Sequence, residues 1–103
     1  MKHVIEHPLD VETAHKVADR AFGEYKAKYP AYDPKLTWTG ERDANIAFSA
    51  KGVHIAGKLK VREGAIDVDL EVPFLLRVFQ SKAIDVIDRE VRRWVERAKA
   101  GEL

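Results

Sequence analysis

The sequence predicts one α+β domain over residues 1–103, with an antiparallel sheet of about five strands and two helices packed on one face. Three observations predict this fold class. Apolar residues recur with a helical period near both ends of the chain, and they alternate with a period of two between those ends. Glycine-containing turns separate the alternating runs. The expected order is strand, helix, four strands, helix.

The chain is expected to open with a short strand over residues 2–7, which a proline then ends. Asp10 stands where its carboxylate can accept hydrogen bonds from the free amide groups of a following helix. Apolar residues continue from Val11 to Tyr29 at a spacing of 3.6 residues. The helix should end near Tyr29, because the next residue is Pro30, which cannot continue it.

Four strands are expected in the middle of the chain, because bulky apolar residues alternate there with polar ones. Each run offers one apolar face, which helices normally cover. The polar positions of the last run are carboxylates, which we expect to face solvent: Asp67, Asp69 and Glu71. The apolar positions are Leu36 and Trp38, then Ile46 and Phe48, then Val53, Ile55, Leu59 and Val61, then Ile66, Val68, Leu70 and Val72.

Two turns set the register of these strands. A two-residue turn at residues 51–52 places Phe48 opposite Ile55, and a second turn at residues 63–64 brings opposite charges together. Gly57 falls at an inward position, where we expect a bulge or a closely packed helix. The pairs that the second turn predicts are Leu59 with Val68, Lys60 with Asp67, and Lys58 with Asp69.

A second amphipathic helix is expected at the carboxyl-terminal end, with Ser81 as its cap. Its apolar residues are Ile84, Ile87, Val91, Trp94, Val95 and Ala98. Its outer face carries opposite charges four residues apart, which favours a solvated, ion-paired surface. These pairs are Asp85 with Arg89, Asp88 with Arg92, and Arg92 with Glu96.

Composition excludes several classes of protein. The formal net charge is only +1 and acids interleave with the bases, so we expect no nucleic-acid partner. The chain has no cysteine, which rules out disulfides and thiol chemistry and fits a reducing compartment. No apolar run has the length of a signal peptide or of a transmembrane segment. We therefore expect a cytoplasmic protein.

No catalytic constellation is present, so we expect no enzyme, no cofactor and no metal. His3 and His7 share a strand face, but no third ligand stands at a known spacing, so these histidines are interpreted as surface residues. Ser49 stands in no nucleophile signature. A small enzyme of acyl metabolism remains an alternative, with His54 and the carboxylates of the sheet as its only candidate groups.

The segment that joins the last strand to the last helix is the most suggestive feature. Its apolar side chains cannot all face one core if the segment is helical. They either plug the end of the sheet or form a contact surface for a partner or an apolar ligand. Candidate binding residues are Phe74, Leu75, Leu76, Val78 and Phe79. Dimerisation is also left open, through Val86 on the last helix or through Ala47 and Ala56 on the outer sheet face.

Several motifs in their order along the chain resemble the polyhydroxyalkanoic acid system family over residues 5–95. They are the first strand and Asp-capped helix, the Trp38 strand, residues 48–53 and 57–59, and the run from Val72 through Phe79 to Lys82. The chain departs from the family pattern around residues 29–36 and 41–43, which affects loops. The resemblance implies a small bacterial protein that acts at polyhydroxyalkanoate storage granules, and it supplies no catalytic residues.

The leading hypothesis is accordingly a non-enzymatic accessory protein that binds granules or granule proteins through the Phe74–Phe79 segment and the adjacent helix. The alternative is a module that binds a small lipophilic ligand, because a curved sheet around a long final helix also resembles a reduced START-like helix-grip domain. Such domains enclose apolar cavities. A cavity in the fold would keep this alternative open, and a solid core would remove it.

Overall fold

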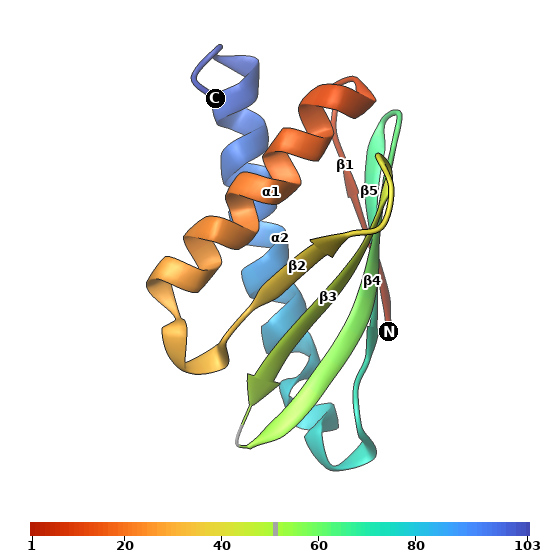
Figure 1. The fold of residues 1–103 in the computed structure, drawn as a ribbon, viewed down its shortest axis with the longest axis vertical. Coiled ribbons are helices and arrows are strands. Elements are labelled where there is room, and N and C mark those ends of the chain that lie inside the picture. Colours follow the sequence, from red (N-terminus) through yellow and green to blue (C-terminus); the bar gives the residue numbers. More distant parts are fainter. Residues whose placement is uncertain (51) are drawn as a thin grey trace.

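The computed structural model describes residues 1–50 and 52–103, with the side chains of Ala50 and Leu75 outside the description. Both helices cover the same face of one twisted sheet (Figure 1). The predicted fold class and element order are confirmed. The elements are β1 (Lys2–Glu6), α1 (Val11–Lys28), η1 (Pro30–Tyr32), β2 (Lys35–Trp38), β3 (Asp43–Ala50), β4 (Val53–Arg62), β5 (Ala65–Glu71), η2 (Phe74–Leu76) and α2 (Arg77–Lys99).

The sheet is antiparallel with the strand order β1-β5-β4-β3-β2, so the first strand lies beside the last. The register that the turns predict is confirmed. Phe48 lies opposite Ile55, although Lys51 of the intervening turn is outside the described residues. Leu59 lies opposite Val68, Lys60 opposite Asp67, and Lys58 opposite Asp69.

Gly57 corrects one prediction. The pairing runs without interruption through Gly57, which lies opposite Ile46 on one side and Leu70 on the other, so there is no bulge. The atoms nearest to this position belong to the neighbouring strand β5 and not to a helix. A Cβ atom at this position would stand 2.5 Å from the carbonyl oxygen of Asp69 and 2.8 Å from a methyl carbon of Leu70. The close neighbour is the adjacent strand, which sequence spacing could not identify.

The helix α1 begins and ends as predicted. The Asp10 carboxylate accepts a hydrogen bond of 2.7 Å from the amide of Thr13, and this bond holds the pKa of the carboxyl below its usual value. The apolar side of the helix is buried against the sheet and against α2. Its buried residues are Ala14, Val17, Ala18, Ala21, Phe22 and Tyr25.

The helix α2 begins at Arg77, four residues before the predicted cap. Ser81 is therefore not a cap but an exposed residue inside the helix. The early start has a local cause, because the amide of Leu76 donates to the carbonyl oxygen of Pro73 at 2.8 Å and closes a helical turn there. The single turn η2 then runs directly into α2. The predicted apolar side is buried at Ile84, Ile87, Val91, Trp94 and Val95.

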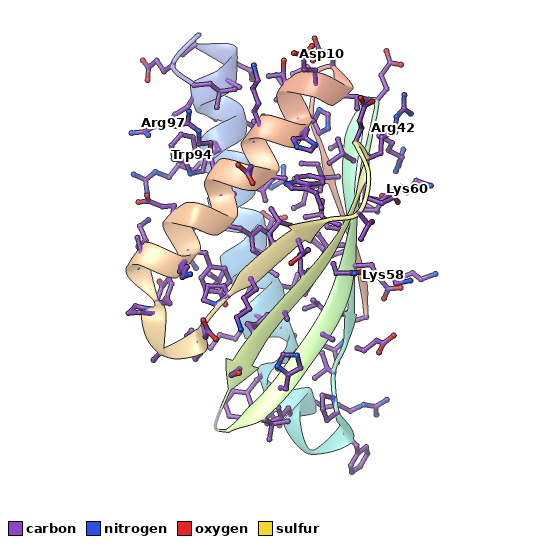
Figure 2. All side chains as sticks on the ribbon, viewed as in Figure 1. Asp10, Arg42, Lys58, Lys60, Trp94 and Arg97 are labelled. Carbon is purple, nitrogen blue, oxygen red and sulfur yellow. The ribbon has the colours of Figure 1, made fainter. Side chains whose placement is uncertain are left out.

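The core lies between the helices and the inner face of the sheet. The alternating residues Ile46, Phe48, Ile55, Leu59, Val61, Ile66, Val68 and Leu70 all point into it and are buried. Charges occupy the opposite face, where Lys58 and Lys60 project from β4 away from the helices (Figure 2). The small residues Ala47 and Ala56 lie opposite each other on that same outer face.

Candidate functional site

The predicted contact segment divides into buried and exposed residues. Leu76 is 5% exposed and belongs to the core, and Phe79 is partly buried against it. Phe74 is 77% exposed and Val78 is 82% exposed, so the interpretation of Phe74 as part of a core plug is wrong. The side chain of Leu75 lies outside the described part of the structure. We refer to Phe74 and Val78 as the exposed pair.

The local structure separates these side chains. Phe74 lies in the single turn η2 and Val78 in the first turn of α2, and both side chains are exposed to solvent while Leu76 is buried. The guanidinium carbon of Arg77 lies 5.5 Å from the centre of the Phe74 ring. The exposed pair is therefore flanked by a cation. Figure 1 places η2 at the end of the sheet where β3 finishes and β4 begins.

A second feature is a cavity of about 360 Å³ between the helices and the sheet, whose sheet side is formed by Phe48 and Ile55 near the β3–β4 turn. It lies within the size range of small-molecule sites in proteins, at the lower end. Residues from α1, η1, β3, β4 and α2 contribute to its wall. They are Tyr25, Tyr29, Tyr32, Phe48, Ile55, Phe79, Lys82, Ala83, Asp85, Val86 and Arg89.

Three tyrosines form one side of this cavity. The rings of Tyr25 and Tyr29 meet edge to face with their centres 5.6 Å apart, and the Tyr29 and Tyr32 centres are 6.0 Å apart. Burial, and then the neighbouring phenols, raise the pKa of Tyr25 to about 12. Its hydroxyl therefore stays protonated at neutral pH. Within the described residues none of the three hydroxyls has a hydrogen-bond partner, so they are free to bond to a ligand.

Charged side chains of α2 line the cavity opposite the tyrosines. Lys82, Asp85 and Arg89 are exposed. The predicted pairing of Asp85 with Arg89 is wrong, and neither Lys82 nor Arg89 forms an ion pair with any residue that the structure describes. Two cations and one carboxylate leave the rim with a net positive charge.

The histidines have structural partners. The Nε2 atom of His3 lies 2.6 Å from a carboxylate oxygen of Asp88, which joins β1 to α2. His7 is buried and its Nδ1 accepts a hydrogen bond from the amide of Leu9, so the interpretation of a surface residue is wrong for His7. His15 stacks on Trp38 with ring centres 3.6 Å apart.

The groups considered for acyl chemistry lie on the open outer face of the sheet. His54 is exposed and lies opposite Ser49. Asp67 lies opposite Lys60, which is roughly 20 Å along β4 from His54 at the usual rise of a strand, and it is held by Arg62 through hydrogen bonds of 2.8 and 3.1 Å. Glu71 lies opposite Ala56, two residues along β4 from His54, and is exposed. The fold thus separates His54 from Asp67 and leaves Glu71 as the carboxylate nearest to it on this open face.

Sequence reasoning found the exposed pair but missed the cavity. The apolar pattern of the sequence includes Tyr25 and Tyr29 as positions of the first helix, and it indicates Val86 only as a candidate dimer contact. The signal that could have indicated the cavity is the phenol at every third or fourth residue, at positions 25, 29 and 32. Phenols side by side seldom serve packing alone, because each hydroxyl needs a partner.

The family comparison agrees with the resemblance seen in the sequence. The family model described as polyhydroxyalkanoic acid system protein matches residues 3–94. Comparison with curated proteins and with solved structures gives no match. Among the residues that the structure describes, no helix combines the length and apolar character needed to cross a membrane.

Proposed function

We propose, from the premise that this chain belongs to the polyhydroxyalkanoic acid system protein family, that it is a non-enzymatic accessory protein that binds storage granules or their proteins. The proposed place of action is the bacterial cytoplasm. The proposed contact is the exposed pair, Phe74 and Val78, together with Arg77. The observation that carries this proposal is the exposure of two large apolar side chains, four residues apart in the chain, at one end of the fold.

The energy available from this contact indicates weak, reversible binding. Full burial of Phe and Val side chains stabilises by about 1.5–3 kcal/mol each, so the exposed pair contributes on the order of 4 kcal/mol. Such a free energy corresponds to a Kd of about 1 mM, before the costs of association are subtracted. One molecule alone would therefore exchange rapidly, and several contacts to one surface would be needed for stable retention.

The test is co-sedimentation with polyhydroxyalkanoate granules. We expect the Phe74→Ser, Val78→Ser double variant to lose most of its bound fraction, because the apolar contact is removed. The matched control is Val4→Ser, which changes an exposed apolar residue on β1, far from the segment, and should still sediment. Thermal unfolding followed by circular dichroism establishes that both variants fold.

Phe79 is a poor choice for this test. It packs partly against the core and lines the cavity, so a polar residue there would change both folding and binding. Two preparations separate the two proposed partners. Retention on polymer particles stripped of protein indicates direct binding to the polymer, and retention on native granules alone indicates a granule protein. Equal sedimentation of the double variant and the wild type on both preparations would refute the contact.

A further inference from the structure

We propose that the cavity between α1, η1, α2 and the β3–β4 hairpin binds an aliphatic carboxylate, with the chain on its apolar wall and the carboxylate toward Lys82 and Arg89. This inference does not depend on the proposed granule contact, because the exposed pair, Phe74 and Val78, does not line the cavity. It assigns a ligand class to a site that no comparison describes.

The wall of the cavity suits a hydrocarbon chain. Phe48 and Ile55 face each other across β3 and β4, and both point from the sheet toward the helices. Ala83 and Val86 approach from α2 and are only partly buried. Phe48 and Ile55 are only 3% and 2% exposed, so they form the floor of the cavity, and an aliphatic chain would bury mainly the partly exposed surfaces of Tyr29, Ala83 and Val86, at about 25 cal/mol per Å² of apolar area.

The polar groups of the cavity favour an acid over a neutral molecule. Lys82 and Arg89 lie seven residues apart, two turns along the same side of α2, and each is without an ion pair in the described residues. The single carboxylate of Asp85 between them does not balance their charge. Hydrogen bonds between cations and a carboxylate are roughly twice as strong as neutral ones.

The tyrosines add donors that match the same ligand. The hydroxyls of Tyr25, Tyr29 and Tyr32 have no partner within the described residues, and a carboxylate or a hydroxyl substituent on the chain would accept their hydrogen bonds. Burial keeps the pKa of Tyr25 high, so its proton is available across the neutral range. A volume of about 360 Å³ suits one short aliphatic chain, which favours a free acid with one chain as the ligand.

The first test compares acids with alcohols on the unmodified chain. Straight-chain carboxylates from butyrate to laurate are titrated into the protein, together with alcohols of equal length, while amide and side-chain shifts are followed by NMR. We expect shifts at Tyr29, Ile55 and Val86, and an affinity for each acid about tenfold above that for its alcohol. Equal affinities, or shifts confined to other surfaces, would overturn the proposal.

The second test removes the cations. The Lys82→Ala, Arg89→Ala double variant should bind acid and alcohol with equal affinity, because only the charge selectivity is lost. The matched control is Lys58→Ala, Lys60→Ala, which removes two positive charges from the outer face of the sheet and should keep the tenfold preference. Val86→Phe, which fills the cavity, should abolish binding of both ligands. If the first double variant kept the preference for acid, the assignment of the carboxylate to this rim would be wrong.

Discussion

The side chain of Asp88 joins the helix α2 to the strand β1. Its carboxylate accepts a hydrogen bond of 2.7 Å from Arg92 one turn along α2, and it meets His3 of β1 at 2.6 Å. Burial opposes ionisation of this carboxyl, but the bonds from Arg92 and His3 outweigh it and hold the pKa below its usual value. The ionised form therefore stabilises the folded state.

This gives a prediction for Asp88→Asn. A carboxyl whose pKa is lower in the folded than in the unfolded state stabilises the protein at any pH above its pKa in the unfolded state. This stabilisation is lost as the pH falls through its pKa in the folded state. We expect Asp88→Asn to lower the free energy of unfolding by about 1 kcal/mol at pH 7 and by progressively less below the ordinary pKa of 3.8. Urea unfolding at a series of pH values measures the difference.

The control for Asp88 is Asp85→Asn, one turn earlier on the same helix. Asp85 is exposed and forms no ion pair with the described residues, so its replacement should leave the free energy of unfolding nearly unchanged. A difference between Asp88→Asn and the wild type that stayed constant from neutral to acid pH would contradict the role given to the charge.

At the scale of elements, α1 and α2 are joined by an ion pair at their contact. Glu90 is 4% exposed and accepts a hydrogen bond of 2.9 Å from the ammonium group of Lys28. Glu24 lies 3.8 Å from both Lys28 and Arg93, which extends the network to the surface. The other oxygen of Glu90 has no partner among the described residues. When a buried carboxylate has one ion-pair partner, removal of that partner strongly destabilises the folded state.

The element prediction concerns Lys28 and Glu90. Lys28→Met leaves the Glu90 carboxylate buried without its cation, and we expect the free energy of unfolding to fall by about 2–3 kcal/mol. The double change Lys28→Met, Glu90→Leu removes both charges and should recover most of that loss, because apolar residues can replace a buried ion pair. Lys26→Met, an exposed change on the same helix, is the control. Chemical denaturation of the four proteins tests this prediction, and a double variant no more stable than Lys28→Met would refute it.

The two ends of α2 differ in what they contact. Its first half lines the cavity, and its second half carries Trp94, with Arg97 stacked 4.7 Å from the centre of the Trp94 ring (Figure 2). The sequence predicted the second half well, since a regular apolar stripe indicates a helix packed on a core. It misplaced the cap of the helix by five residues, Ser81 in place of Leu76, because the turn closed by Pro73 and Leu76 has no side-chain cap to mark it.

At the scale of the whole molecule, the sequence predicts the features that depend on residues close together in the chain. The hairpin registers followed from turn position and alternation, and opposite charges such as Lys58 and Asp69 confirmed them. Gly57 was misinterpreted because its crowding comes from Leu70 on another strand. The cavity was missed for the same reason, since its wall combines residues as distant as Tyr25 and Arg89. Contacts of this range follow from tertiary packing and leave no local pattern.

The two proposed surfaces should act independently. They lie near the same end of the fold, yet among the described side chains of the predicted contact segment only Phe79 also belongs to the cavity wall. Val78 lies one turn before Lys82 on α2, so the two surfaces adjoin there, but different side chains make the contacts proposed for each ligand. The Phe74→Ser, Val78→Ser variant should therefore bind carboxylates within about twofold of the wild type, while Lys82→Ala, Arg89→Ala should sediment fully with granules. The NMR titration and the sedimentation assay, each applied to both variants, measure these two activities. A folded variant that lost both activities would show that the exposed pair and the cavity form a single site.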